Sequence, residues 1–441
     1  MVRTRFAPSP TGNIHIGGLR TALYAYALAK HNKGEFILRI EDTDKKREVE
    51  GATEKIKELL NLFGLIWDEY FIQSERVKSG IYKKAAEKLV KEGHAYYCQH
   101  EGRNAKKEGF SKELRDSCRD KNLTSGAIKL RVPDNEKVSF KDFVVGKEIS
   151  WNTSDVADAT LLKSDGFPTY HLAVVVDDND MKVSHVLRGH DWMPSTPIHL
   201  LVHKYLGFKL PEIGHLTDIL DPEGGKLSKR KGSTSVEGLL KEGYLPSALL
   251  NYVCLLGWAP KNNQEIFSLE EFVAMFDPKG FQKSNPVFDR AKLDWMNGEY
   301  IRKADLEGFI RMLKSESSGF SEELLKKIAP LIKDRIKKLS EFGNYTRFFI
   351  EEPTVEKKLL GPNSKKHLEA AKKALDKIKK WDLEEINEVL MEAVKDNGFK
   401  IGDFFMDLRI AVTGTRFTPP INDSIVILGK DTTLKRLSKV T

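Results

Sequence analysis

The sequence has few cysteines and no long apolar run. Three cysteines occur among 441 residues, at Cys98, Cys118 and Cys254. This small, odd number argues against a disulfide framework and for a reducing cytoplasm. No apolar stretch approaches the length of a membrane span, and the first residues lack the apolar segment of a secretion signal. Internal repeats and low-complexity tails are also lacking. We therefore expect a cytoplasmic globular protein that does not contact a membrane.

Charge is present in both signs with a modest basic excess. The formal net charge is +8, and residues 301–441 hold 28 Lys and Arg against 22 Asp and Glu, so six of the eight surplus charges lie there. A basic C-terminal third suits contact with a phosphate backbone, although a solvated lysine-rich helical surface would look the same. The length exceeds what one hydrophobic core supports and predicts about three domains.

The first forty residues predict a βαβ unit. Residues 3–7 alternate as a strand does, residues 19–30 carry apolar side chains at helical spacing, and residues 35–40 read as a second strand. Such a unit implies a parallel sheet with ligands at its carboxyl edge. Residues 159–162 and the apolar run 172–176 read as strands that continue this sheet, with the run 172–176 as a buried parallel strand. From residue 310 onward the pattern is helical, with Pro330 as a kink or break.

The loop between the first strand and the first helix has a distinctive composition. Residues 8–18 read Pro-Ser-Pro-Thr-Gly-Asn-Ile-His-Ile-Gly-Gly. The prolines stiffen the exit from the strand, Gly12 supplies a turn, and Gly17 and Gly18 let a flat ligand lie against the backbone. His15 stands beside the helix N-terminus, where free N–H groups attract phosphate. The loop therefore predicts a nucleotide site. A basic loop at residues 226–230, Lys-Leu-Ser-Lys-Arg, follows a Gly-Gly turn far along the chain.

These two segments together resemble the two ATP-binding motifs of class I aminoacyl-tRNA synthetases. The first is similar to the family's His-Ile-Gly-His motif, with Gly18 in the last place, and the second to its Lys-Met-Ser-Lys-Ser motif, with Leu227 and Arg230 substituted. Pro-Ser-Pro-Thr-Gly ahead of His15 narrows the resemblance to the glutamyl and glutaminyl branch. Residues 292–302 and 408–414 resemble segments of the glutamyl enzymes of bacterial type.

The resemblance implies an α/β Rossmann-like catalytic domain, whose parallel sheet is split by an inserted module, followed by an all-α anticodon-binding domain. Its expected parts are the first half of the catalytic domain at residues 1–95, an inserted acceptor-binding module at 96–158, the second half at 159–235, a stem-contact helical domain at 236–305 and a helical anticodon-binding domain at 306–441.

The implied reaction is the activation of glutamate with ATP, followed by transfer of glutamate to the 3′ end of tRNA(Glu). A carboxylate needs no general base to attack phosphorus, so positioning and charge stabilisation suffice. The resemblance implies His15, Lys226 and Lys229 as catalytic residues and Mg²⁺ as the companion of ATP. It implies ATP binding by Pro8, Ser9, Thr11, Gly12, His15, Gly17, Gly18, Lys226, Ser228 and Lys229.

A substrate with a second carboxylate calls for arginines at strand ends. The family's glutamate-binding positions carry over to Arg5, Ala7, Ser9, Glu41, Tyr170 and Arg188. Two residues depart from the family pattern: Val174 stands where asparagine is usual, and His190 where an acidic residue is usual. Val174 removes a polar contact from the expected amino-acid pocket and His190 changes its local charge, while the arginines favour an anionic substrate over an amide.

A zinc site is conceivable but not favoured. Cys98, His100, Cys118 and Asp120 fall where some family members hold structural zinc, yet this donor set is unusual for a closed structural site.

Three alternatives are weighed against a glutamate–tRNA ligase. A glutaminyl enzyme has a β-barrel C-terminal half, whereas residues 310–441 read as helical. A short paralogue that glutamylates a modified tRNA base lacks a helical anticodon-binding domain. A non-catalytic tRNA-binding paralogue would not need His15, Lys226 and Lys229. We expect a monomer whose partners are L-glutamate and tRNA(Glu), and the sequence leaves open whether tRNA(Gln) is also charged.

Overall fold

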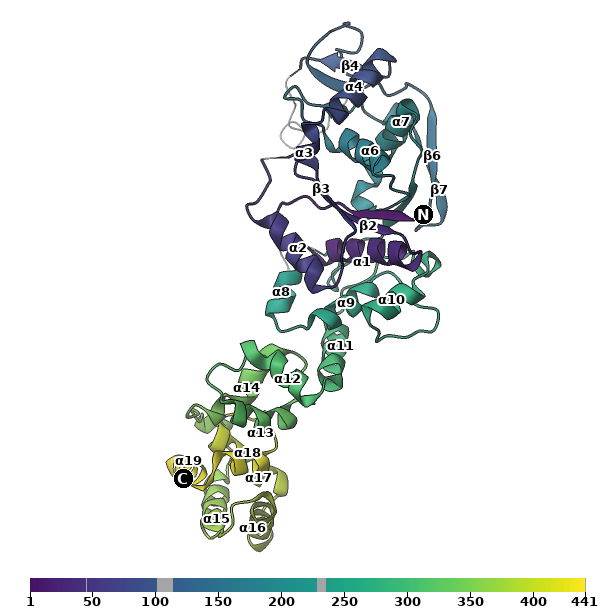
Figure 1. Cartoon of the computed structure of the whole chain (residues 1–441). Coiled ribbons are helices and arrows are strands. Elements are labelled where there is room, and N and C mark those ends of the chain that lie inside the picture. Colours follow the sequence, from purple (N-terminus) through teal and green to yellow (C-terminus); the bar gives the residue numbers. More distant parts are fainter. Residues whose placement is uncertain (45, 101–113, 228–234, 441) are drawn as a thin grey trace. The chain divides into compact units, whose positions relative to one another are not determined.

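The computed structural model describes residues 1–44, 46–100, 114–227 and 235–440 (Figure 1). The chain divides into two compact units. The first comprises Met1–Leu240 and Pro246–Arg290, and the second comprises Lys241–Leu245 and Ala291–Thr441. All strands among the described residues lie in the first unit. The division into five parts is finer than these two units and stays a prediction.

The first unit opens with the predicted βαβ arrangement. Strand β1 (Arg3–Phe6) pairs in parallel with β2 (Glu35–Ile40), and α1 (Ile16–His31) connects them. Strand β3 (Glu69–Ile72) joins the other edge of β2, also in parallel, after α2 (Ala52–Leu62). Because all three strands run the same way, their carboxyl ends meet at one edge of the sheet.

A second group of strands continues beside β1. Strands β9 (His185–Gly189) and β10 (Glu212–Leu216) are parallel and are connected through α7 (Thr196–Leu206). The Ser184 N–H donates to the Arg3 carbonyl at 2.9 Å, which joins the start of β9 to β1. The hairpin of β6 (Lys137–Asp142) and β7 (Lys147–Asn152) adds to β10. Part of the stretch expected to be an inserted module thus extends this sheet.

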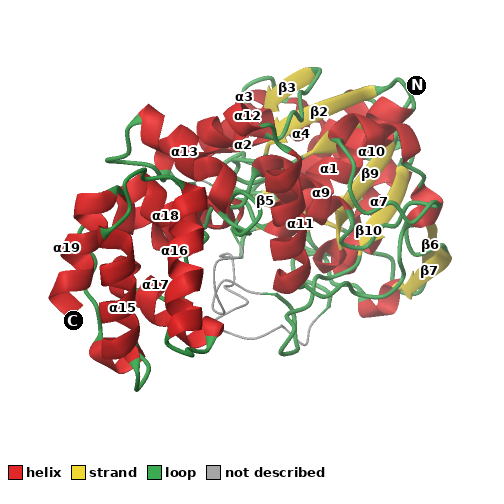
Figure 2. Ribbon diagram, turned by 90° about the horizontal axis from the view of Figure 1, so that it is seen from below, coloured by secondary structure: helices red, strands yellow, loops and turns green. Residues whose placement is uncertain are grey.

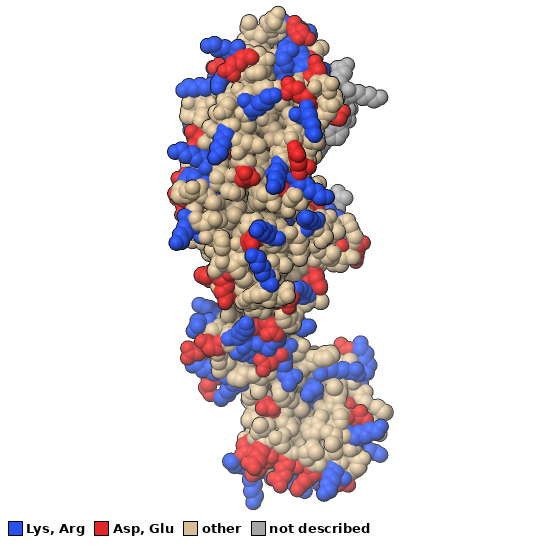
Figure 3. Space-filling view, turned by 90° about the vertical axis from the view of Figure 1, so that its right-hand side faces the viewer, with Lys and Arg blue, Asp and Glu red and all other residues tan. Residues whose placement is uncertain are grey.

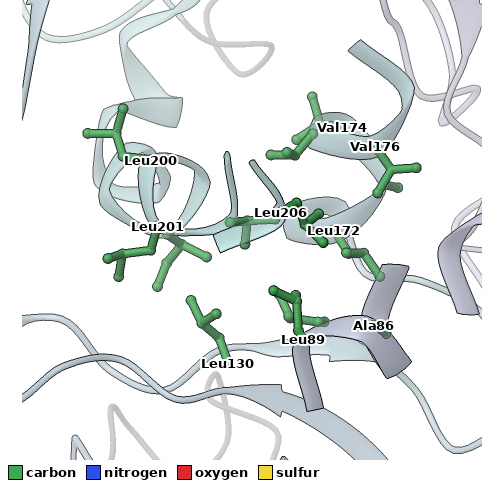
Figure 4. Close-up of a cluster of buried hydrophobic side chains, with 14 of the residues drawn as sticks. Ala86, Leu89, Leu130, Leu172, Val174, Val176, Leu200, Leu201 and Leu206 are labelled. Carbon is green, nitrogen blue, oxygen red and sulfur yellow. The ribbon is translucent and has the colours of Figure 1, made fainter. Parts of the chain in front are cut away.

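The strand predicted at residues 172–176 is wrong, because these residues lie in helix α6 (Tyr170–Asp180). All five side chains are buried. They pack with α4 (Ile81–Lys91), β5 (Ala127–Leu130) and α7, as Figure 4 shows for Leu172, Val174 and Val176. A helix surrounded by protein has no polar face, so its apolar run cannot be distinguished from a buried strand by periodicity.

The strand at residues 159–162 also differs from its prediction. Strand β8 (Thr160–Leu162) pairs with β5, and β5 with β4 (Ala95–Cys98), in a separate antiparallel sheet of three strands. It therefore does not continue the first sheet. The remaining longer helices of this unit are α3 (Gln73–Val77), α8 (Val236–Lys241), α9 (Pro246–Cys254) and α10 (Leu269–Met275).

In the second unit, every regular element among the described residues is a helix. Its helices are α11 (Arg290–Lys303), α12 (Leu306–Met312), α13 (Glu322–Ile332), α14 (Phe342–Thr346), α15 (Ser364–Asp376), α16 (Leu383–Asp396), α17 (Ile401–Thr413), α18 (Ile421–Leu428) and α19 (Lys430–Val440). Pro330 lies inside α13, which ends two residues later. Helices α15 to α18 pack side by side (Figure 2) around buried side chains such as Leu375, Leu390, Phe404 and Ile425. The predicted helical C-terminal domain is confirmed.

On the side drawn in Figure 3, Lys and Arg are interspersed with Asp and Glu and form no continuous basic patch. Among the described residues, no helix combines the length and apolar character needed to cross a membrane.

Candidate active site

The loop from β1 to α1 is held at the carboxyl edge of the sheet. Gly12 has φ of +127°, a value that favours glycine, so the predicted turn is confirmed. The Glu41 N–H donates to the Pro8 carbonyl at 3.0 Å, which ties the loop to the end of β2. His15 precedes α1 in an extended conformation, with φ −83° and ψ 160°. The imidazole is therefore next to the positive end of a sixteen-residue helix.

Gly17 presents bare backbone at the start of α1. A Cβ placed there would meet no atom within 4 Å, whereas one at Gly18 would lie 3.2 Å from Ile14 Cγ2. Because Gly17 also lines a cavity, a side chain at this position would take up ligand space.

The segment that follows the second motif returns to the first. Ser235 forms a bridge with His15, and the Val236 N–H donates to the Ile14 carbonyl at 3.0 Å. Lys226 and Leu227 line the same cavity as His15. The predicted site residues Ser228 and Lys229, together with Arg230, lie outside the described residues.

One cavity of about 500 Å³ gathers the predicted site residues that the structure describes. Its lining combines the loop, the end of β2, the start of α6 and the end of β9. The predicted residues in it are Arg5, Ala7, Pro8, Ser9, Thr11, Gly12, His15, Gly17, Gly18, Glu41, Tyr170, Arg188 and Lys226. Residues far apart in the sequence thus share a volume large enough for a small-molecule substrate.

Arg188, near the end of β9, is buried among neutral acceptors. Its Nε donates to His215 Nε2 at 2.9 Å, its Nη1 to His199 Nδ1 at 3.0 Å and to the Tyr170 hydroxyl at 3.3 Å, and its Nη2 to Thr196 Oγ1 at 2.8 Å. No described carboxylate bonds to it directly. Burial lowers the pKa of Arg188 below its ordinary value. Arg188 lines the cavity, and the described side chains that bond to it are all neutral.

Arg5 is different, because its Nε donates to Asp178 Oδ1 at 3.2 Å. Arg39, which is fully buried in β2, donates to Asp178 Oδ1 at 2.6 Å and to Glu41 Oε1 at 3.0 Å. Although burial works against ionisation, these two arginines lower the pKa of Asp178. Burial also raises the pKa of Glu41, against the opposing effect of Arg39. Of the two predicted arginines in the cavity, Arg188 alone is left without a carboxylate partner in the described part of the chain.

Lys226, which also lines the cavity, is held by two carboxylates. Its ammonium group pairs with Asp191 and, at 3.0 Å, with Asp218. Burial works against the charged form, but the two carboxylates raise the pKa of Lys226. The lysine is therefore charged and already turned toward the cavity.

Sequence reasoning missed several residues at this site. Trp192 lines the cavity with its ring centroid 4.2 Å from that of Tyr170, and Asp191 and Asp218 hold Lys226. Arg39 could have been found, because a charged residue inside the apolar strand at residues 35–40 needs a buried partner. The carboxylates give no such signal in the sequence.

The two departures from the family pattern, Val174 and His190, differ in their surroundings. Val174 is 3% exposed and packs in the core around α6, and His190 is exposed at the start of the short helix η2 (His190–Ser195). Neither is among the residues that line the cavity.

A second cluster of donor atoms contains Cys98, His100, Cys118 and Asp116, all within 4.8 Å of one another. The prediction of Asp120 as the fourth member is wrong. Its side chain is 87% exposed and pairs with Arg131 at 3.1 Å. Asp116 instead accepts from the Cys118 N–H at 2.8 Å, which turns it toward the cluster. Two thiols, an imidazole and a carboxylate are chemically acceptable zinc ligands.

Two family models match this chain. Residues 1–295 match the catalytic domain of class I tRNA synthetases (E and Q), and residues 301–441 match an anticodon binding domain. The glutamate–tRNA ligase of Finegoldia magna is 38% identical over 483 residues, with 99% of each chain covered. That of Clostridium tetani is 40% identical over 473 residues, with 99% of this chain and 96% of the relative covered.

Solved structures agree with this relationship. A glutamate tRNA ligase from Elizabethkingia meningosepticum, solved in complex with its amino acid, has a TM-score of 0.85 and 33% identity, with 99% of this chain and 98% of that chain covered. The glutamate–tRNA synthetase of Elizabethkingia anophelis also has a TM-score of 0.85, with 32% identity and 99% of both chains covered. The chain therefore belongs to the glutamate–tRNA ligase family of class I aminoacyl-tRNA synthetases.

Proposed function

We propose that this chain is a glutamate–tRNA ligase that converts glutamate and ATP to glutamyl-adenylate and then transfers glutamate to the 3′ end of tRNA(Glu). One observation carries the proposal. A single cavity holds a helix N-terminus with His15 and a bare Gly17 beside a buried arginine, Arg188, that bonds to no carboxylate among the residues described by the structure. Phosphate suits the first feature and a substrate carboxylate suits the second. The family relationship supports the same activity.

In the first step the α-carboxylate of glutamate attacks the α-phosphorus of ATP. A bond forms between a carboxylate oxygen and phosphorus, and the bond to pyrophosphate breaks. The nucleophile carries its own negative charge, so no proton has to be removed. The protein is then required to align the two substrates and to stabilise the charge that moves onto the leaving group.

On the ATP side, we assign phosphate binding to His15 and to the N–H groups at the start of α1. Gly17 admits the adenosine against the backbone. Lys226 neutralises charge on the leaving pyrophosphate, after exchanging its pairs with Asp191 and Asp218 for phosphate oxygens. Lys229 and Ser228 take the corresponding roles that the family resemblance implies.

On the amino-acid side, Arg188 and the Tyr170 hydroxyl bind the side-chain carboxylate. Tyr170 accepts a bond from Arg188, so its hydroxyl hydrogen is available to donate to the substrate. Glu41 binds the ammonium group, Arg5 adds positive charge, and Ala7 and Ser9 contact the substrate from the loop. Glutamine would leave Arg188 uncompensated, which disfavours the amide.

Metal ions have limited parts in this proposal. Mg²⁺, when bound with ATP, supplies further positive charge to the phosphates. Asp191 and Asp218 are cavity carboxylates of the kind it prefers. Zinc at the Cys98 cluster would cross-link that segment and has no part in the reaction.

The second unit supplies the tRNA contact. Its match to an anticodon binding domain supports recognition of tRNA(Glu), and whether tRNA(Gln) is also a substrate depends on its surface side chains. We propose that the protein acts as a monomer in the cytoplasm.

The test is tRNA-dependent incorporation of labelled glutamate, with AMP formation measured in the same reaction. We expect glutamylation that requires ATP and tRNA(Glu), and loss of activity in Lys229→Ala. Absence of charging by the unmodified protein, or equal turnover in the variant, would contradict the proposal. Parallel reactions with tRNA(Gln) decide the tRNA range.

A further inference from the structure

The surroundings of Arg188 are built to orient it without neutralising it. A guanidinium group has five N–H donors and stays charged at any physiological pH. Four described acceptors take four of these donors, and all are neutral groups on His215, His199, Thr196 and Tyr170. One N–H and the full positive charge remain for a ligand.

His215 can accept from Arg188 only in one tautomer. Its Nε2, 2.9 Å from Arg188 Nε, must carry the lone pair, so its hydrogen must be on Nδ1. Asp142 Oδ2 lies 2.7 Å from that Nδ1 and accepts the hydrogen. A ring that accepts at Nε2 and donates from Nδ1 carries a single hydrogen and is neutral. Burial, which lowers the pKa of His215 although Asp142 opposes this, favours the same form. The carboxylate therefore selects the tautomer that Arg188 needs.

Asp142 is itself fixed in place. It is fully buried at the end of β6, and its Oδ1 accepts from the backbone N–H groups of Val144 and Val145, each at 2.9 Å. The backbone N–H of His215 donates to its Oδ2 at 3.1 Å. A carboxylate held by three backbone donors and one imidazole cannot rotate toward Arg188. The imidazole ring of His215 therefore separates the negative charge of Asp142 from Arg188.

We propose that Asp142 and His215 are positioning residues for recognition of the substrate carboxylate: Asp142 fixes the tautomer of His215, and His215 orients Arg188 while its charge stays free for the substrate. The proposal rests on the proposed function, in which Arg188 binds the side-chain carboxylate of glutamate. It assigns a role in amino-acid selection to the β6–β7 hairpin, which the sequence indicated only as part of an inserted module. A carboxylate in direct contact with Arg188 would instead compete with the substrate.

Two variants of His215 separate orientation from packing. In His215→Gln the amide oxygen can accept from Arg188 in place of Nε2, so we expect a KM for glutamate within about threefold of the unmodified protein. His215→Leu has no acceptor, and loss of a hydrogen bond to a charged group predicts a KM for glutamate about ten- to a hundredfold higher. The KM for ATP should stay unchanged in both.

A double-mutant cycle tests the role of Asp142. Asp142→Asn should raise the KM for glutamate about tenfold or more in the presence of His215, because the amide can no longer fix the tautomer. In the His215→Gln background the same change should have an effect of less than about threefold, because the glutamine side chain has no tautomer to fix. Equal effects in both backgrounds would show a purely structural role and overturn the proposal.

Folding and function are kept apart in this experiment. Each variant is compared by its KM for ATP and its thermal unfolding, and should Asp142→Asn fail to fold, the His215→Gln and His215→Leu pair decides. An unchanged KM for glutamate in His215→Leu would overturn the positioning role. If the unmodified protein charges no tRNA with glutamate, the proposed function fails before any variant is measured, whereas failure of this inference leaves that activity intact.

Discussion

Replacing Arg188 by glutamine isolates the charge that we assign to substrate recognition. The change removes a buried guanidinium that is 6% exposed and bonds to no described carboxylate. Glutamine keeps one amide group that can donate to the surrounding acceptors. The substrate carboxylate, however, loses both a charged donor and its counter-charge.

The size of the effect follows from two overlapping terms. A hydrogen bond to a charged group contributes about 1.5–3 kcal/mol. Two unit charges about 4 Å apart attract by about 4 kcal/mol at an effective dielectric constant near 20. Because both describe the same contact, we expect a loss of about 3–4 kcal/mol, which corresponds to a fall of about 10²- to 10³-fold in kcat/KM for glutamate.

Stability should respond differently from activity. Arg188 is a desolvated cation in the free protein, and removing it breaks no ion pair with a residue that the structure describes. We therefore expect an apparent unfolding temperature within about 4 °C of the unmodified protein, measured by scanning fluorimetry. Kinetics are measured by tRNA glutamylation at varied glutamate and saturating ATP. A value of kcat/KM within threefold of the unmodified protein would refute the assignment of Arg188 to the carboxylate.

Four further predictions follow from the same contacts. Lys226→Ala should lower kcat about 10²- to 10³-fold with the KM for glutamate nearly unchanged, and an unaltered kcat would contradict its role at the pyrophosphate. Metal analysis should find less than one zinc per ten chains, because the Asp116 carboxylate already pairs with Lys129 at 2.6 Å and would have to give up this partner to bind zinc. A ratio near one zinc per chain would instead establish the site. Burial lowers the pKa of His171 from 6.5 to about 4, so the unfolded chain binds the proton first as the pH falls. The free energy of unfolding should therefore fall as the pH drops from about 6.5 toward 4, and at pH 5 it should be lower by about 2 kcal/mol. Urea unfolding at several pH values should show a weaker pH dependence for His171→Phe than for the unmodified protein. Leu172→Ala should lower the free energy of unfolding by about 2–5 kcal/mol, and a loss below 1 kcal/mol would contradict its place in the core of α6.

The sequence predicted the first part of the fold well, because its signals there are local. The βαβ unit, the turn at Gly12 and the helix behind His15 follow from residue types within a few positions of one another. The helical second unit was predicted from periodicity in the same way. Its helices argue against the glutaminyl alternative, for which a β-barrel was expected in this part of the chain. Because these interactions join residues that are close in the sequence, they can be predicted from a short segment without the rest of the chain.

The errors occurred where the environment, and not the local pattern, sets the outcome. Residues 172–176 are apolar because α6 is enclosed on several sides, and that enclosure comes from α4, β5 and α7. Asp116 joins the Cys98 cluster in place of Asp120, although both stand two residues from Cys118. Spacing alone cannot distinguish these two aspartates, because the fold decides which of them points inward.

By itself, the sequence determined which chemical groups are available: a histidine and glycines at a helix start, a basic loop, and arginines. Only the tertiary structure decided which arginine has no carboxylate partner among the described residues. Arg5 meets Asp178 across 173 positions of the chain, whereas Arg188 meets neutral imidazoles, one of which is set by Asp142. The physical reason is that the net charge at a site depends on which groups lie within a few ångströms of one another, and those contacts are made between residues distant in the sequence.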